Sequence, residues 1–140
     1  MTQLAGVALW LAVLGQTLLI AVSAQIPARL GWRTELPRME ERNRALFLVA
    51  TGYIVFTYLA FAVLTAVLHD ELVRGDRAAL ALAGFIGLFW LVRLVVDAVW
   101  FRHRMWPAGR RFVVARVLLD CGIAAFAATY LGLVAWHLLR

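Results

Sequence analysis

Four long apolar runs, separated by polar connections, dominate the chain. Each run is longer than the roughly 20 residues that a helix needs to cross about 30 Å of hydrocarbon. None of them shows the alternating pattern of a membrane β-strand. The pattern therefore predicts an all-α integral membrane protein with four transmembrane helices. We place these helices at about residues 3–25, 44–68, 78–101 and 112–139.

The connections predict how the helices are arranged. Those after the second and third helices are short, and short links make consecutive helices antiparallel neighbours. Pro27, Gly31 and Pro37 break up the longer first connection. We therefore expect an up-down bundle that forms a single domain over residues 1–140. Small residues that allow close helix contacts recur in the last two runs: Ala83, Gly84, Gly87, Gly122, Ala124, Ala125, Ala127, Ala128 and Gly132.

Composition supports a membrane location, and charge sets an orientation. Hydrophobic residues make up 64% of the chain and the mean hydropathy is +0.84, whereas about half of a soluble domain is apolar. The net charge of +6 comes from fourteen arginines and no lysine. Nine of them lie in the first and third connections and three lie on the other side, which predicts that those two connections are cytoplasmic. We therefore expect an inner-membrane protein with its N- and C-termini outside.

The remaining charged and reactive residues limit the partners. Membrane topology already accounts for the nine arginines, so we expect no nucleic-acid partner. Anionic lipids at the cytoplasmic face are a further partner for the same side chains. The lone Cys121 excludes an internal disulfide and any CxxC motif. His69 and His137 lie near the outer boundary, but no HxxxH or HxxE spacing indicates a metal site. We expect no metal and no cofactor.

One pattern occurs twice inside the apolar runs, where charge is costly. Arg93-Leu-Val-Val-Asp97 and Arg116-Val-Leu-Leu-Asp120 each place an arginine four residues before an aspartate. A lone arginine or aspartate at mid-helix costs roughly 2.5–3.5 kcal/mol on insertion scales, so we expect these four residues, named here the Arg/Asp quartet, to pair. Counted from the helix ends, Arg93 lies level with Asp120 and Asp97 with Arg116. The quartet therefore predicts ion pairs within each helix and also across the two helices.

Other polar side chains lie at comparable depth in the predicted helices. We expect six of them to line a site around the quartet: Gln16, Thr51, Tyr53, Tyr58, Trp90 and Tyr130. Stripes of threonine and tyrosine are more often typical of packing and of hydrogen bonds between helices than of a pore.

Three functions are compatible with the quartet. Ionisable residues inside a membrane mark substrate, ion or proton sites, so the first is a small protein that binds or translocates an ionic or lipid-like ligand. The second is a non-catalytic subunit of a larger membrane complex, in which the quartet clasps two helices. The third is a membrane enzyme that uses Asp97 or Asp120 as acid/base on a lipid-soluble substrate, although the sequence assigns no catalytic residue. A bundle of this size has little room for a cavity, so transport predicts a homo-oligomer or a membrane-complex partner.

Overall fold

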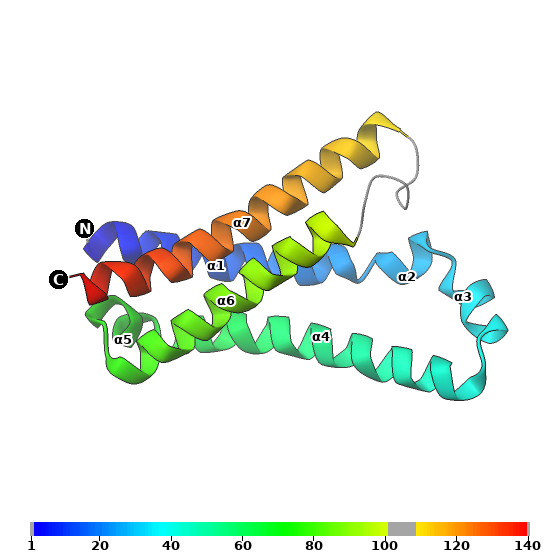
Figure 1. Cartoon of the computed structure of the whole chain (residues 1–140), viewed down its shortest axis with the longest axis horizontal. Helices are drawn as coiled ribbons and strands as arrows, with labels where there is room; N and C mark the ends of the chain where they lie inside the picture. Colours follow the sequence, from blue (N-terminus) through cyan, green and yellow to red (C-terminus); the bar gives the residue numbers. More distant parts are fainter. Residues whose placement is uncertain (1, 101–108, 140) are drawn as a thin grey trace. The chain divides into compact units, whose positions relative to one another are not determined.

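Helices account for nearly the whole structure. The computed structural model describes residues 2–100 and 109–139, and over this part the chain is 91% helical with no strand. Arg102 and Arg104 of the third connection lie outside the described residues. The described part contains four helices that are long and apolar enough to cross a membrane (Figure 1): α1 (Thr2–Ser23), α4 (Glu41–Val67), α6 (Arg77–Val99) and α7 (Arg110–Leu138). The predicted all-α class with four membrane-length helices is confirmed, with helix bounds that differ by one to three residues.

The connections contain short helices that the pattern did not predict. Between α1 and α4 the chain forms α2 (Ile26–Arg29), α3 (Trp32–Glu35) and the 3-10 helix η1 (Leu36–Arg38), and between α4 and α6 it forms α5 (His69–Arg74). Such helices span one or two turns, so they are too short to show an apolar period in the sequence. They fold the connections without changing the order of the long helices.

Contacts divide the chain into two compact units. The second unit, Trp10–Val67, contains most of α1 together with α2, α3, η1 and α4. Gly31 has a φ of +63°, a left-handed conformation that favours glycine, and it turns the chain from α2 into α3. The Trp32 ring then packs edge-on against Phe47 of α4, with ring centroids 5.0 Å apart. The single domain expected from the sequence stays a prediction.

The first unit comprises Met1–Leu9 and Leu68–Arg140. Here Gly75 ends α5 with a φ of +82°, and the N–H groups of Gly75 and Asp76 both donate to the Glu71 carbonyl, at 2.9 and 3.0 Å. These bonds satisfy the C-terminus of α5. A Cβ atom on Gly75 would lie 2.3 Å from His137 Nδ1. The imidazole of His137 therefore packs directly on the Gly75 backbone and holds the end of α7 against α5.

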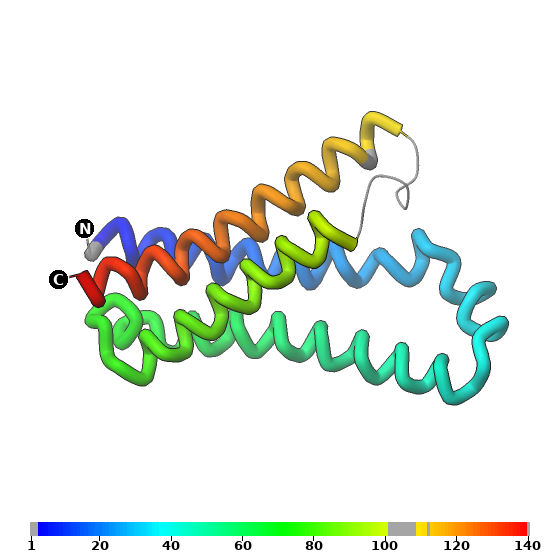
Figure 2. Tube along the Cα trace, viewed as in Figure 1, coloured from blue at the N-terminus to red at the C-terminus, as the bar shows by residue number. Residues whose placement is uncertain are grey.

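Helices α6 and α7 form the most extensive helix–helix contact of the first unit, and they run in opposite directions (Figure 2). The two helices approach closely at Gly87, where an added Cβ would lie 2.8 Å from Leu131 Cγ and 3.1 Å from the Leu131 backbone nitrogen. About one turn further on, the Trp90 ring contacts Phe126 at a centroid distance of 5.1 Å. The two helices then separate toward the last turn of α6 and the first turn of α7 (Figure 1). We call this end of the pair the open end.

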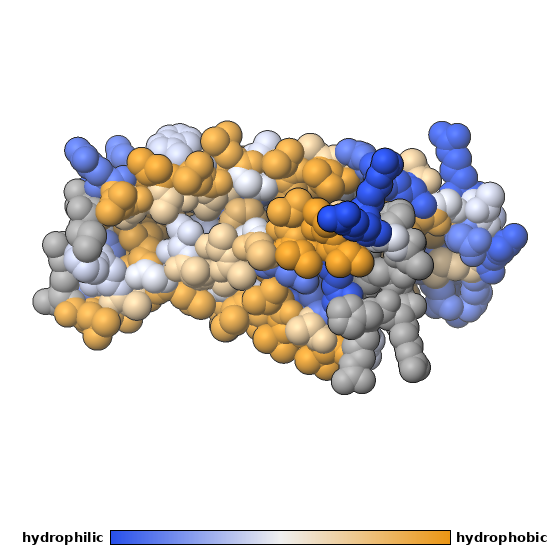
Figure 3. All heavy atoms as spheres, turned by 90° about the horizontal axis from the view of Figure 1, so that it is seen from above, coloured by the Kyte–Doolittle hydropathy of each residue, from blue (hydrophilic) through white to orange (hydrophobic). Residues whose placement is uncertain are grey.

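Apolar side chains cover the outward faces of the long helices. Large hydrophobic residues of α1 such as Leu11, Leu14 and Leu18 are exposed, and the same holds along the other three long helices. Figure 3 shows hydrophobic residues over much of one face, with hydrophilic ones among them. Soluble monomers rarely expose contiguous apolar surface of this extent. The exposed surface therefore suits lipid contact by a multi-pass protein.

Candidate functional site: the Arg/Asp quartet

Both Arg/Asp pairs form within their own helices. Arg93 Nη1 donates a hydrogen bond to Asp97 Oδ1, one turn further along α6. Arg116 Nε lies 3.7 Å from Asp120 Oδ2, one turn further along α7. A spacing of four residues places both members of a pair on one helix face, so the predicted pairs within each helix are confirmed. The side chains of Asp97 and Arg116 are 10% and 15% exposed, whereas those of Arg93 and Asp120 are 33% and 36% exposed.

The two most buried members continue the faces that α6 and α7 turn toward each other. On α6 the buried residues are Ala79, Ala83, Ile86, Gly87, Trp90 and Asp97. On α7 they are Ile123, Phe126, Ala127, Tyr130 and Leu133, and Arg116 lies two turns before Ile123. Trp90 and Tyr130, two of the expected lining residues, are fully buried on these faces. Helical spacing therefore turns Asp97 and Arg116 into the space between the two helices.

At the quartet, Arg116 joins the two helices through a backbone carbonyl. Its Nη2 atom donates to the carbonyl oxygen of Asp97 at 3.5 Å. This carbonyl belongs to the last turn of α6, whose carbonyls lack partners within the helix, and a cation is favourable at this negative end of a helix. This backbone contact, at the limit of hydrogen-bond length, links the two helices at the quartet. The two expected cross-helix ion pairs stay a prediction.

The register of the two helices differs from the one expected from the helix ends. Trp90 lies opposite Phe126, and antiparallel helices advance in opposite directions, so Asp97, seven residues further along α6, lies close to the level of Asp120. Arg93 was expected at the same height as Asp120. In the structure the two differ in height by about three residues, or about 4.5 Å. Counting from the helix ends assumed that both helices end at the same height.

Among the described residues, one acceptor atom of Asp97 has no partner. Its Oδ1 atom accepts from Arg93, whereas Oδ2 is buried and receives no hydrogen bond from any described residue. Burying an acceptor without a hydrogen bond costs about 1–3 kcal/mol. Each unsatisfied buried group in a native protein therefore calls for a specific cause. The Oδ2 atom can accept a hydrogen bond or bind a cation, in a site that carries two positive and two negative charges.

The other expected lining residues belong to the second unit. Gln16 and Tyr58 are buried and Thr51 is half-buried, whereas Tyr53 is 68% exposed and faces outward. The hydroxyl of Thr51 donates to the Phe47 carbonyl at 2.8 Å within α4. This is the helix-internal bond that a packing threonine makes. That these residues line a site around the quartet stays a prediction.

The two histidines near the helix ends contact other elements of the first unit. His69 Nδ1 lies 3.0 Å from Asp70 Oδ1, and His69 Nε2 lies 3.2 Å from the Gly6 carbonyl oxygen. The His69 imidazole therefore ties α5 to the first turns of α1. His137 packs on Gly75 as described above. In the part of the chain that the structure describes, no group of three histidine, cysteine, aspartate or glutamate side chains could hold a metal ion.

The backbone carbonyl oxygen of Asp97 was not identified from the sequence as part of the site. The signal for it was present, because Pro107 and Gly109 indicate a turn soon after Asp97. A helix that ends there leaves carbonyls free for a donor from the next helix. The apolar sequence of α6 or of α7, taken alone, does not predict that the two helices separate at the open end.

A function for the chain is inferred from its own residues, because no protein-family model, curated protein or solved structure matches it. The quartet is the cluster of paired charges that the structure brings together inside two membrane-length helices. It is therefore the candidate site.

Proposed function

We propose that the chain is a small polytopic protein of the inner membrane that binds or translocates an ionic or lipid-like ligand at the Arg/Asp quartet. The observation that carries this proposal is the buried Oδ2 atom of Asp97, which receives no hydrogen bond from a described residue although it lies in a membrane-length helix. Burial of such a group is unfavourable unless a partner completes it. A bound ligand supplies that partner.

The charges of the quartet favour a ligand with no net charge. Two arginines and two aspartates leave the site neutral, and adding an unbalanced charge at low dielectric is costly. The Asp97 Oδ2 atom requires a donor or a cation, while the partly exposed guanidinium of Arg93 can bind an anion. A zwitterionic lipid head group, with an ammonium and a phosphate, matches both requirements.

A ligand reaches the quartet from the open end of the α6–α7 pair. Asp97 lies two residues before the end of α6, and α7 begins with the exposed residues Arg110 and Arg111. The excess of arginine supports a cytoplasmic location for this end, with both termini outside. A lipid of the cytoplasmic leaflet therefore has its head group at the depth of the quartet.

Native mass spectrometry of the protein released from mild detergent tests this proposal. Phosphatidylethanolamine, which is zwitterionic, and phosphatidylglycerol, which is anionic, are added separately and the bound fraction is compared. We expect a defined adduct with the zwitterionic lipid, at least tenfold reduced in Asp97→Asn and in Asp120→Asn. Asp76→Asn is the matched control, because Asp76 is a surface acid outside the quartet.

Each result of this experiment has a defined meaning. Equal adducts of both lipids, or adducts unchanged in Asp97→Asn, contradict a specific site at the quartet. The same spectra report whether the chain is a monomer, a homo-oligomer or part of a complex with other polypeptides. A homo-oligomer supports translocation, since this chain alone has little room for a pathway.

The second candidate is a structural subunit in which the quartet clasps α6 to α7. The contact of Arg116 with the Asp97 carbonyl favours it, because this contact joins the two helices. Both ion pairs nevertheless close within one helix, so they add little to the attraction between helices. The double variant Arg116→Leu, Asp120→Leu removes the link without leaving an unpaired charge. A clasp predicts that this variant loses α6–α7 association, whereas a ligand site predicts a folded protein that no longer binds lipid.

A further inference from the structure

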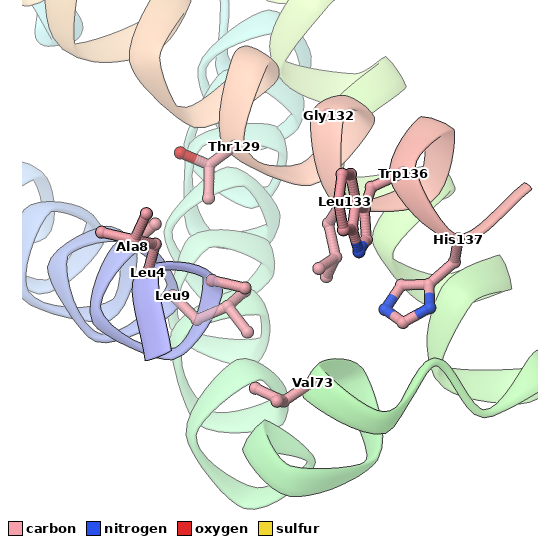
Figure 4. Close-up of a pocket in the computed structure, with 10 residues that line it drawn as sticks. Leu4, Ala8, Leu9, Val73, Thr129, Gly132, Leu133, Trp136 and His137 are labelled. Carbon is pink, nitrogen blue, oxygen red and sulfur yellow. The ribbon is translucent and has the colours of Figure 1, made fainter. Parts of the chain in front are cut away.

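A cavity at the other end of the first unit is separate from the quartet. It has a volume of about 270 Å³ and lies between the first turns of α1, α5 and the last turns of α7. Leu4, Leu9, Val73 and Leu133 supply apolar walls (Figure 4). The cavity is partly open. It is therefore a pocket that a ligand can enter.

Small side chains create the space. Ala5, Ala8 and Gly132 lie on the lining, and a Cβ atom added to Gly132 would meet nothing within 4 Å. A large side chain at any of these positions would occupy the pocket. Leaving apolar surface unfilled sacrifices contacts that a protein interior normally makes. An apolar guest restores those contacts.

Polar ring atoms stand at one side of this apolar space. Figure 4 shows the Trp136 indole and the His137 imidazole projecting from α7 toward the side of the pocket where Val73 of α5 lies. Neither imidazole nitrogen of His137 makes a hydrogen bond with another described residue, although the ring packs on Gly75. The pocket therefore offers a hydrogen-bonding group beside apolar walls, which is the usual composition of a small-molecule site.

We propose that this pocket binds the ring of a lipid-soluble quinone or quinol. An apolar cavity of about 150 Å³ is enough to hold benzene, so about 270 Å³ accommodates one six-membered ring with small substituents. The His137 imidazole bonds to a ring oxygen, and the isoprenoid tail leaves through the open side into lipid. An acyl chain alone would leave the imidazole without a polar partner.

The position of the pocket suits such a ligand. Leu4 lies in the first turn of α1 and Trp136 in the last turn of α7, so the pocket lies at the membrane–water boundary in the proposed orientation. Tryptophan is favoured at this depth. An amphipathic ring with polar oxygens and an apolar tail is favoured there for the same reason.

Binding of a short-chain benzoquinone to the purified protein in detergent, followed by isothermal titration calorimetry, tests this inference. Gly132→Phe fills the pocket and is expected to weaken binding at least tenfold. Gly122→Phe is the matched control, because Gly122 also lies in α7 and its added Cβ meets nothing within 4 Å, yet it does not line the pocket. His137→Phe is expected to weaken binding about fivefold, the loss of one hydrogen bond, whereas His137→Gln retains most of it.

Two results would overturn the inference. One is binding by Gly132→Phe that equals that of the unchanged protein. The other is equal binding of an alkane with the same chain but no ring, which would make the pocket a site for acyl chains. Gel filtration and the melting temperature without ligand establish that each variant is folded. If Gly132→Phe fails this check, Ala8→Leu fills the pocket from α1 and replaces it.

Discussion

The close approach of α6 and α7 at Gly87 gives the sharpest test of the structure. In Gly87→Ala the new Cβ would lie 2.8 and 2.9 Å from two side-chain carbons of Leu131 and 3.1 Å from its backbone nitrogen. Real Cβ atoms do not approach carbon at the shorter distances. The Leu131 side chain can rotate in part, but its backbone nitrogen moves only with the whole helix. The two helices must therefore separate to accept one methyl group.

The size of the effect follows from comparison with Gly84, three residues earlier on α6. A Cβ on Gly84 would lie 4.0 Å from Val134 Cγ2, an ordinary contact. Both substitutions gain about 0.5–1 kcal/mol of helix propensity, so the difference between them isolates the overlap. Overpacking in a tight contact costs about 1–3 kcal/mol. We expect Gly87→Ala to be less stable than Gly84→Ala by about that amount.

Titration with SDS in mixed micelles measures both free energies of unfolding. Tryptophan fluorescence is a suitable signal, because the fully buried Trp90 lies about one turn from Gly87 in the same contact. Leu131→Ala in the Gly87→Ala background removes the two side-chain overlaps but leaves the backbone one. We therefore expect the double variant to be more stable than the sum of the two single changes. Equal stability of Gly87→Ala and Gly84→Ala would refute the close packing.

Three other predictions concern other parts of the chain. Gly75→Ala destabilises the protein by at least about 1–2 kcal/mol in the same SDS titration, the usual cost of a left-handed conformation. The overlap of the new Cβ with the His137 ring adds to this cost, and adding His137→Ala to Gly75→Ala relieves only that added part. Arg116→Gln lowers the free energy of unfolding by about 1.5–3 kcal/mol, the range for hydrogen bonds to charged groups. In whole cells, Leu139→Cys reacts with an impermeant thiol reagent and Thr34→Cys does not, because the first connection is cytoplasmic in the proposed orientation.

These predictions have internal controls. The labelling variants carry Cys121→Ser, since Cys121 is itself exposed. Labelling of Thr34→Cys from outside would reverse the proposed orientation. An Arg116→Gln protein as stable as the parent would show that the contact with the Asp97 carbonyl contributes nothing. Full relief of Gly75→Ala by His137→Ala would show that the left-handed φ is not required there.

The sequence predicted local features well, because they depend on one helix at a time. Apolar length alone located α1, α4, α6 and α7, and a spacing of four residues alone placed Arg93 beside Asp97. Features that depend on two helices were predicted less well. The level of Asp120 depends on the close approach at Gly87 and on the separation beyond it. Neither quantity is encoded in the apolar pattern of one run.

The pocket beside His137 lay beyond sequence reasoning for a related reason. Its lining comes from the first turns of α1, from α5 and from the last turns of α7, which are far apart along the chain. Gly132 was recognised as a small residue suited to close helix contact. The structure instead leaves open space beside it. A glycine in a membrane helix can thus mark either a contact or a cavity, and only the neighbouring elements distinguish the two.

Because each ion pair of the quartet closes within one helix, each helix carries its own counter-charge during synthesis. The i,i+4 spacing lets Arg93 meet Asp97 as soon as α6 is helical, whether or not α7 is present. In the proposed membrane location, α6 and α7 are therefore two segments whose charges are already compensated, and neither depends on the other for that compensation. Pairs that closed only between α6 and α7 would have required both helices to enter together. The pairing within each helix thus makes the order of membrane assembly independent of the final contact between α6 and α7.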